Sequence, residues 1–372
     1  MTNSIALTIR REVLLNSLAN LKNIITEKSP LAILNHVKLE AKNGELFIFA
    51  SDMDIMVSEA LKAEITMQGS LTVNAKAFYD IIKKMADEVI DVKGNADTGR
   101  LNIKGKSCRF TLPCLNSEEF PIIPRDDFDC NVDIKIEEFL KLLNKARFAA
   151  SDNEAQYQLN GVNLQLRESK LQAQACNGHK LARIATEACS VENFPNIILP
   201  SKAIEVIIRI LKKPNVDVKI TASTTKICLE YDNLVIVSKL IDGDFPNIDS
   251  VFPSDDPLFS VMFIREILLN AVGRVALASN ELSHAITFTF TENLLTISTR
   301  GQENQTAEED LQVICAMEKF VINFNSKYMI EILSNTSSES LRFDFRNGKS
   351  PIIIGHNFAD ANEVYLISPI SG

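Results

Sequence analysis

Residues 200–213 read Pro-Ser-Lys-Ala-Ile-Glu-Val-Ile-Ile-Arg-Ile-Leu-Lys-Lys, and they decide how the rest of the chain is interpreted. At 100° per residue, the apolar side chains fill one broad face of a helix and the charged side chains fill the other. Ser201 is expected to cap this helix, and Pro214 is expected to end it. A single helix of this kind is usually an ordinary surface helix. Here, however, the pattern recurs along the chain.

Six helical segments recur in two alternating series. They are Ile9–Ile24, Ala75–Ala86, Ile136–Ala149, Ser201–Lys213, Ile264–Leu277 and Ser326–Ser334. In the second series the helices begin at 75, 201 and 326, so equivalent positions lie 126 and 125 residues apart. This period is too long for a solenoid repeat, so each unit is expected to be a domain with its own core. The loops after Phe120-Pro121 and Phe245-Pro246, called here the first and second Phe-Pro pairs, place the domains at 1–125, 126–252 and 253–372.

Strands are expected between the helices, where apolar and polar residues alternate. The clearest are Ile33–Glu40, Glu45–Ala50, Leu159–Leu166, Leu234–Leu240, Ala285–Thr291, Leu294–Thr299, Leu341–Phe345 and Pro351–Ile354. Ile33–Glu40 and Glu45–Ala50 flank the dipeptide Asn43-Gly44, and Leu341–Phe345 and Pro351–Ile354 flank Asn347-Gly348. Each of these two pairs of strands is predicted to form a hairpin. The predicted fold class is therefore α+β, with three repeated domains that each contain two helices and antiparallel sheets.

Composition excludes several classes of protein. Hydrophobic residues make up 46% and charged residues 23% of the chain, which is typical of a soluble globular protein. The apolar runs are too short for a membrane span, and the N-terminal segment has no secretory pattern, so a cytoplasmic location is expected. The seven cysteines are scattered without a Cys-x-x-Cys pair, which indicates reduced thiols. The histidines are equally dispersed, so neither a metal site nor a cofactor is expected.

The helices differ in charge from the rest of the chain. The six segments contain 16 Lys and Arg but 7 Asp and Glu, a balance of +9, whereas the whole chain carries −9 and the remainder therefore −18. Helix propensity does not explain this excess, because Glu forms helices about as well as Lys. Basic helices in an acidic protein favour contact with a polyanion. Lys76, Arg209, Lys212 and Lys213 are candidate contacts to phosphate, and no sequence-reading motif accompanies them.

The number of helices is consistent with a ring around DNA. If two chains each contributed six helices, with about 10 Å between neighbouring axes, the axes would lie on a circle about 38 Å across. Subtracting about 10 Å for the helices leaves an opening of about 28 Å, which admits a B-form duplex. One chain alone would give half that circle, which is too tight. The pattern therefore favours a dimeric ring.

Several motifs resemble those of a known family. They are Leu31–Leu34, Tyr157–Gly161, Asn177–Ala182, Ser238–Pro246 and Ser279–Glu281. Together with the threefold repeat, they make the whole chain resemble the bacterial DNA sliding clamps, the β subunits of DNA polymerase III. The resemblance implies a head-to-tail homodimeric ring around duplex DNA. It also implies that the ring has no catalytic residue, tethers polymerases, and is opened by a clamp loader that binds the ATP itself.

The resemblance further implies a groove between the second and third domains, which binds short hydrophobic peptide motifs of polymerases, the loader and repair proteins. Carried over by position, the groove comprises Leu159, Cys176, Gly178, His179, Lys180, Leu181, Pro246, Ser250, Val251, Pro351, Leu366, Ile367, Ser368, Pro369 and Ile370. An apolar pocket with a few polar groups suits peptide capture. Judged without the family, His179 could equally be a histidine that only packs a loop.

Three departures from the family pattern affect this groove. The tail ends Ser-Pro-Ile-Ser-Gly, where the family commonly has the more apolar Met-Pro-Met-Arg-Leu. Cys176 stands where Thr is common, and Ser250 stands where Arg is common. The peptide preference is therefore expected to differ from that of other family members.

The same resemblance implies residues for DNA contact and for the dimer seam. The DNA contacts are Lys28, Asn153, Tyr157, Gln158 and Lys202, of which Gln158 replaces a common Tyr and so puts one stacking contact in doubt. The seam joins basic and apolar residues of the first domain to apolar and acidic residues of the third. These are Lys104, Lys106, Arg109, Phe110 and Leu112, and Leu277, Glu303, Glu308 and Glu309. Opposite charges fit a heterologous interface, although ordinary edge strands carry such charges too.

Two other functions stay open at this point. A metal-dependent nucleic-acid enzyme needs clustered carboxylates, and Asp52-Met53-Asp54 is the nearest candidate, without a partner motif. A glycine-rich phosphate loop is absent from the sequence, which argues against an ATPase. A peptide-binding scaffold that does not encircle DNA is the third possibility, but it would have no need of basic helices.

Overall fold

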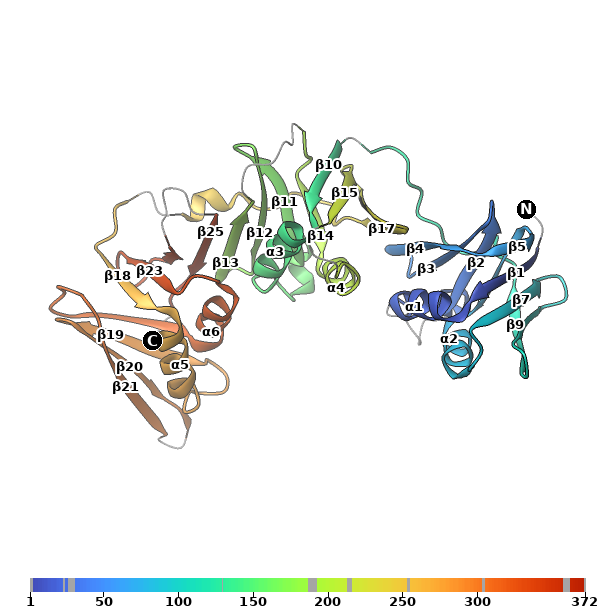
Figure 1. Ribbon diagram of the computed structural model, residues 1–372. Coiled ribbons are helices and arrows are strands. Elements are labelled where there is room, and N and C mark those ends of the chain that lie inside the picture. The colour runs from blue at the N-terminus through green and yellow to red at the C-terminus, as the bar shows by residue number, and fades with distance from the viewer. Residues whose placement is uncertain are drawn as a thin grey trace. The chain divides into compact units, whose positions relative to one another are not determined.

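The computed structural model describes residues 3–22, 24–25, 31–128, 130–186, 193–212, 216–252, 255–302, 305–356 and 362–370 (Figure 1). All six predicted helices are present, with ends that differ from the predicted ones by a few residues. They are α1 (Arg11–Leu21), α2 (Ala75–Lys84), α3 (Ile136–Arg147), α4 (Ser201–Ile210), α5 (Arg265–Ala276) and α6 (Ser326–Asn335). None of the described helices is long and apolar enough to cross a lipid bilayer.

The chain forms two compact units, of which the first comprises Met1–Ile136 and Lys202–Leu240. Its strands form one antiparallel sheet in the order β10-β15-β16-β17-β4-β3-β2-β6-β9-β8-β7-β1-β5. Their bounds are β1 (Ser4–Arg10), β2 (His36–Lys42), β3 (Glu45–Ser51), β4 (Ile55–Lys62), β5 (Glu64–Met67), β6 (Gly69–Asn74), β7 (Val89–Asn95), β8 (Arg100–Lys104), β9 (Arg109–Leu115), β10 (Cys130–Lys135), β15 (Asp217–Ala222), β16 (Lys226–Tyr231) and β17 (Leu234–Lys239). Helices α1 and α2 lie side by side against this sheet (Figure 1).

The second unit comprises Glu137–Ser201 and Ile241–Gly372 and contains two antiparallel sheets. The larger has the order β14-β11-β12-β13-β25-β24-β23-β18, and the smaller has the order β21-β20-β19-β22. Their bounds are β11 (Gly161–Arg167), β12 (Lys170–Cys176), β13 (Lys180–Ala185), β14 (Ile197–Pro200), β18 (Phe259–Ile264), β19 (Ala285–Thr291), β20 (Leu294–Arg300), β21 (Thr306–Gln312), β22 (Phe320–Asn325), β23 (Ser340–Phe345), β24 (Ile352–Gly355) and β25 (Glu363–Ile367). Helices α5 and α6 pack against each other in this unit.

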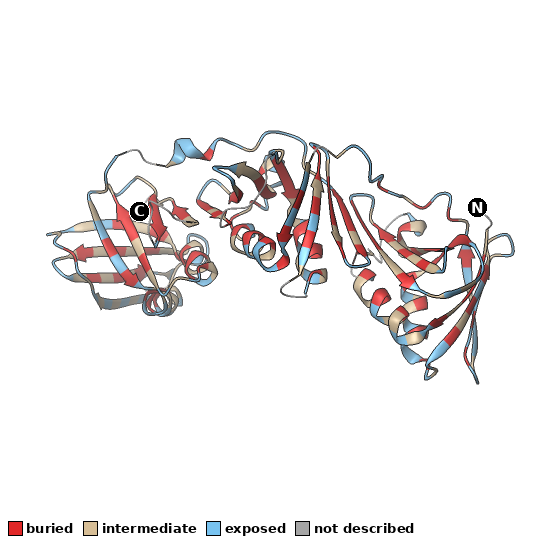
Figure 2. Cartoon of the chain, turned by 45° about the horizontal axis from the view of Figure 1, so that its top comes forward, coloured by how far each residue is buried: buried red, intermediate tan, exposed pale blue. Residues whose placement is uncertain are grey.

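Side-chain periodicity explains where the core lies (Figure 2). Along β19, Ile286, Phe288 and Phe290 are fully buried, because alternate residues of a strand point to the same face. Along α2, Phe78 and Ile82 are buried, whereas the lysines of the opposite face are exposed. Each helix therefore uses one face for the core and leaves a charged face outside it.

Helix α4 begins differently from the prediction. Ser201 is its first residue and not its cap, since the Ser201 hydroxyl donates a hydrogen bond of 2.9 Å to the Asn160 carbonyl. The residues that directly precede α2 and α6, Asn74 and Asn325, do cap their helices. Their side-chain oxygens accept hydrogen bonds from backbone N–H groups of the first turn. Pro214 lies outside the described residues.

One predicted hairpin turn is confirmed and the other is wrong in detail. Asn43 and Gly44 both have positive φ, 53° and 79°, and connect β2 directly to β3. Strands β23 and β24 do pair, but a longer loop joins them. In that loop the Asn347 side chain accepts hydrogen bonds from the backbone N–H groups of Lys349 and Ser350. The predicted strands at 33 and 159 also begin late, because short 3₁₀ helices, Ala32–Asn35 and Glu154–Leu159, precede them.

Main-chain pairing continues across both predicted domain boundaries. In the first unit β17 pairs antiparallel with β4, with Val237 opposite Met56. In the second unit β25 pairs antiparallel with β13, with Leu366 opposite Leu181. Each of these strand pairs lies inside one compact unit. Residues 126–252 are therefore divided, with 126–136 and 202–240 in the first unit and 137–201 and 241–252 in the second. The boundaries at 125 and 252 themselves stay predictions.

Candidate peptide-binding and DNA-contact surfaces

The loop that connects β12 to β13 is a tight turn built by Asn177. Its side-chain oxygen accepts hydrogen bonds of 3.0 Å from the backbone N–H groups of both His179 and Lys180. Gly178 adopts a φ of +88°, a conformation that glycine takes without steric cost. The turn leaves the His179 side chain exposed and directs Lys180 into the protein.

Beside this turn lies a cluster of apolar residues from four segments. Leu181, Ile248, Ile353 and Leu366 form its buried part. Cys176, Phe245, Phe252 and Val364 pack against it and are only partly buried. Because this rim is accessible, the cluster can extend its apolar contacts to an added side chain.

Lys180 connects β13 to α6 in the second unit. Its side chain is 5% exposed and forms an ion pair with Glu331. The Lys180 ammonium also lies 5.0 Å from the ring centroid of Tyr328, and the ring of His179 stacks on Tyr328 at 6.0 Å. The backbone N–H of Ser368 donates to the His179 carbonyl at 2.8 Å, which fixes the start of the C-terminal tail beside the turn.

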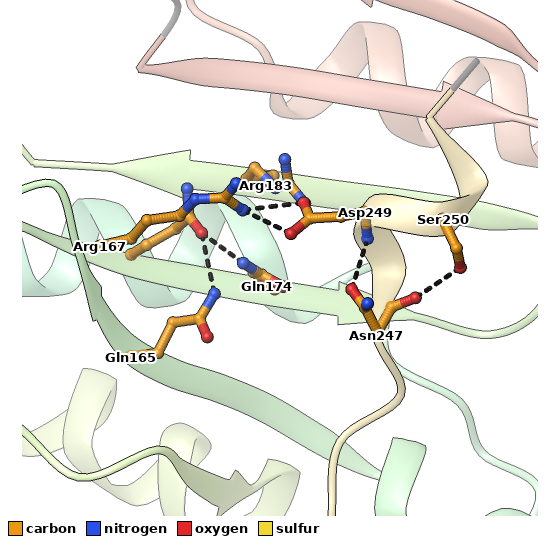
Figure 3. Close-up of polar contacts among 8 residues, drawn as sticks. Gln165, Arg167, Gln174, Arg183, Asn247, Asp249 and Ser250 are labelled. Atoms are coloured by element: carbon orange, nitrogen blue, oxygen red, sulfur yellow. Dashed lines mark hydrogen bonds and ion pairs between the residues drawn. The ribbon is translucent and has the colours of Figure 1, made fainter. Parts of the chain in front are cut away.

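The segment after the second Phe-Pro pair is held by the carboxylate of Asp249 (Figure 3). Arg167 donates two hydrogen bonds of 2.8 Å to this carboxylate, and Arg183 donates one of 2.5 Å. The Arg183 guanidinium also lies 4.2 Å from the ring centroid of Phe252. Hydrogen bonding by Arg167, followed by that of Arg183, holds the pKa of Asp249 below its ordinary value. Burial lowers the pKa of Arg183.

The structure brings together only some of the predicted groove residues. Cys176, Leu181 and Leu366 share the apolar cluster, and His179 contacts Ser368 through the backbone. Leu159 is buried in a separate 3₁₀ helix, and Pro351 directly precedes β24. Near the cluster, Pro246, Ser250 and Val251 are exposed; the Val251 side chain is 46% exposed. Ile367 is buried, and Ser368, Pro369 and Ile370 are half-buried.

The predicted DNA contacts are mostly exposed, as their role requires. Lys76, Asn153, Tyr157, Lys202, Arg209 and Lys212 are exposed, and Gln158 is half-buried. Lys202 forms an ion pair with Asp52, so part of its charge is balanced within the first unit. Lys28 and Lys213 lie outside the described residues.

Some basic residues of the helices serve the fold. Arg11 donates to the Ile82 carbonyl at 3.4 Å, and its equivalent Arg265 donates to the Leu333 carbonyl at 3.2 Å. Lys145 forms an ion pair with Glu363, and Arg274 forms one with Glu309. The excess of +9 therefore overstates the charge that the helices offer to a ligand.

The described seam residues lie on three strands, in the loop between β8 and β9, and at the end of one helix. Lys104, Lys106, Arg109 and Phe110 are exposed near β8 and β9, and Leu112 is half-buried. Leu277 directly follows α5 and is 86% exposed. Glu308 is exposed on β21, whereas Glu309 accepts hydrogen bonds of 2.9 and 2.5 Å from Arg274. Glu303 lies outside the described residues.

Asp52 and Asp54 belong to a structural turn and not to a metal site. One carboxylate oxygen of Asp52 accepts hydrogen bonds of 3.0 and 2.7 Å from the backbone N–H groups of Asp54 and Ile55. Asp54 forms an ion pair of 3.3 Å with Lys239. The described residues hold no group of three His, Cys, Asp or Glu side chains that could bind a metal ion. The turn repeats the geometry of Asn177, with Met53 at the positive-φ position.

Comparison with known proteins decides the family. Three family models match, the N-terminal, central and C-terminal domains of the DNA polymerase III beta subunit, over residues 5–124, 133–247 and 249–371. The chain belongs to the DNA polymerase III beta subunit family. Like the rest of this family it consists of three clamp domains, and it is a DNA sliding clamp, a non-catalytic processivity factor. The resemblance seen in the sequence and the predicted α+β fold are thereby confirmed.

Relatives of the beta subunit family cover the whole chain at moderate identity. The "Beta sliding clamp" of Caulobacter vibrioides is 28% identical, with 98% of this chain and 99% of the relative aligned. The solved beta subunit of Pseudomonas aeruginosa has a TM-score of 0.94 and 26% identity, covering 99% of this chain and 100% of that one. The clamp of Bartonella birtlesii, solved bound to griselimycin, has a TM-score of 0.91 and 29% identity over 99% and 100% of the two chains.

Sequence reasoning missed several residues of this beta subunit's surfaces. Ile353 and Phe252 belong to the apolar cluster, and Tyr328 stacks on His179. The sequence did contain one signal for this cluster: Phe245 of the second Phe-Pro pair is followed three residues later by another apolar residue, Ile248. Nothing in the sequence indicates that Arg183 and Asp249 meet, because they are 66 residues apart.

Asp249 provides a test of the polar network. We expect its carboxyl, followed by NMR, to titrate below the usual value of about 3.9. Because its folded pKa is lowered, the carboxylate stabilises the fold fully above the unfolded pKa, and this contribution disappears as the pH falls through the folded pKa. Arg167→Ala should move the titration midpoint of Asp249 upwards. The control Arg100→Ala should leave it in place, and an unchanged midpoint in Arg167→Ala would refute the assignment.

Proposed function

We propose that two copies of this sliding clamp form a closed ring whose inner wall consists of the basic helix faces. The observation that carries this proposal is the repeated helix geometry. Lys76 on α2 and Arg209 on α4 are exposed opposite a buried face, and Lys212, two residues after α4, is exposed as well. Phosphates need only such a surface for sequence-independent contact. Lys28, Asn153, Tyr157, Gln158, Lys202 and Lys213 are proposed to join this contact.

The ring is proposed to close through β9 and β21. Strand β21 is the edge of its sheet, and β9 pairs with β6 through only two residues, so much of its second edge is available. The third domain carries negative charge here, on Glu303 and on Glu308 of β21. The first domain carries positive charge, on Lys104, Lys106 and Arg109. Unlike ends of this kind form a heterologous contact that closes after two subunits.

The apolar cluster around Leu181 and Leu366 is proposed to bind short hydrophobic peptides. Its partly exposed rim, the turn at Gly178 and His179, and the tail from Ser368 to Ile370 would surround the peptide. The partners proposed for this groove are the replicative polymerase, the clamp loader and repair polymerases. The protein is proposed to act in the cytoplasm. Its first and second domains are proposed to end at residues 125 and 252.

The DNA contact is tested by reversing charge on α4 and the segment that directly follows it. Arg209→Glu with Lys212→Glu should lower the amount of clamp loaded on nicked circular DNA by about five- to tenfold, because cation–phosphate attraction becomes repulsion. The matched control, Lys62→Glu with Lys93→Glu, changes the net charge equally on two strands and should load normally. Circular dichroism verifies that both variants are folded. Normal loading of the α4 variant would remove this helix from the inner wall.

The peptide groove is tested by removing Ser368–Gly372. This deletion should weaken binding of a fluorescent hydrophobic pentapeptide by at least about tenfold, since the tail forms one side of the proposed site. Sedimentation should still show a dimer, because the deleted residues are outside the proposed seam. Lys319→Ala is the control and should bind normally. Unchanged affinity, or dissociation into monomers, would contradict the assignment.

A further inference from the structure

The internal repeat allows the two junctions between domains to be compared position by position. At the first junction Met56, Ile123, Cys228 and Val237 form a buried apolar cluster. The first three lie 125 residues before Leu181, Ile248 and Ile353 of the second cluster (56 and 181, 123 and 248, 228 and 353). Both junctions thus have the same apolar foundation, built on β4 and β17 in one unit and on β13 and β25 in the other.

The surroundings of the two clusters differ in chemistry. At the second junction, Gln172, Gln174, Arg183 and Asp249 take part in the polar network of Figure 3. The positions 125 residues earlier hold Phe47, Phe49, Ser58 and Pro124. The sheet face that carries polar side chains at the second junction is therefore aromatic and apolar at the first.

A cavity lies at the first junction, beside these apolar residues. Its volume is about 520 Å³, and its apolar lining includes Phe47, Phe49, Met56, Ile122 and Val235. Ser58 is part of the wall, whereas its equivalent Arg183 reaches across to Asp249 and Phe252. The Ile122 side chain is 44% exposed, so the cavity is accessible from outside. A volume of this size suits a small ligand or a short peptide.

Charged groups stand at the two ends of this cavity. Lys42 is on β2 and Glu230 on β16, and the strand order between them is β2-β3-β4-β17-β16. Four strand spacings of about 4.8 Å separate the two strands by about 19 Å, and the register places Glu230 level with Lys38, four residues or about 13 Å along β2 from Lys42. The two charged groups are therefore about 23 Å apart, a span that about six residues of extended peptide cover when the end side chains reach outward. The Lys42 ammonium lies 4.9 Å from the ring centroid of Phe47 and forms an ion pair of 2.6 Å with the buried Glu40. Its side chain is 39% exposed, so a ligand carboxylate can share the ammonium with Glu40. Arg125 approaches Glu230 only to 3.9 Å, with both side chains nearly half exposed, so a ligand cation can replace it.

We propose that the first junction binds an extended peptide of about six residues, with apolar side chains at its centre, an acidic residue at the Lys42 end and a basic residue at the Glu230 end. This extends to a second site the peptide binding proposed for the groove, and it rests on that function. The apolar floor supplies affinity, and the opposed end charges fix the direction of the peptide.

The test uses methyl NMR of the full-length dimer labelled at methionine and isoleucine. The probe is a six-residue peptide with lysine at one end, glutamate at the other, and leucine and phenylalanine between them. Methyl shifts are expected at Met56, Ile122 and Ile123, all at the first junction. A second peptide with glutamate at both ends should bind about tenfold more weakly, because one end then meets Glu230.

Two variants block the cavity in different ways. Ser58→Arg places at the first junction the side chain that its equivalent carries at the second, and should weaken binding of the probe about tenfold or more. Ile122→Arg makes the change at a more exposed position and should have the same effect if Ser58→Arg fails to fold. The control Thr224→Arg, in the turn between β15 and β16, should bind the probe normally.

The two proposed sites have separate readouts. Probe shifts confined to Ile248 and Ile353 would overturn the proposal, and so would the absence of any shift. If shifts at Ile248 and Ile353 persist until Ser368–Gly372 is deleted, the groove at the second junction stands even when the first junction fails. Binding at Met56 and Ile123 that is unaffected by Ser58→Arg and Ile122→Arg would also overturn the assignment.

Discussion

Antiparallel main-chain pairing across the domain junctions is the interaction on which the rest of the structure depends. Strands β4 and β17 join one pair of domains, and β13 and β25 join the next, at positions that the internal repeat makes equivalent. An unpaired strand edge readily recruits another strand. Among the described residues, β21 is an edge strand and β9 pairs with β6 through only two residues, so both can accept a further strand. We propose that a second copy pairs with both of these strands.

The same pairing separates the roles of the remaining surfaces. Since the sheets provide the connections, the helices are free to carry charge on their outer faces. The basic residues of the helices divide into two groups in the structure. Arg11 and Arg265 fasten the two helices of a domain to each other, whereas Arg209 and Lys212 are exposed. The inner wall that we propose for the exposed group would attract phosphates without reading bases, and a clamp that slides requires that property.

Periodicity and repetition made much of the fold predictable. The six helices and the repeat near 125 residues follow from apolar patterns that tertiary packing reinforces. Local details were less predictable where side chains compete with backbone patterns. Asn347 turns its loop through its side chain and not through a two-residue hairpin, and Ser201 bonds to Asn160 instead of capping α4. The contacts of Asp249 and the cavity beside Phe47 depend on which segments meet in space, and periodicity carries no such information.

We propose that the protein stays on DNA because its closed ring encircles the duplex, and that electrostatic contact only positions the duplex inside the ring. The direct measurement is to load the clamp on nicked circular DNA with a clamp loader, linearise half of the sample, and compare how much clamp remains bound. A closed ring should stay on the circle at moderate salt and slide off the linear molecule. Equal retention on both forms, with release governed by salt alone, would contradict it and indicate ordinary groove binding.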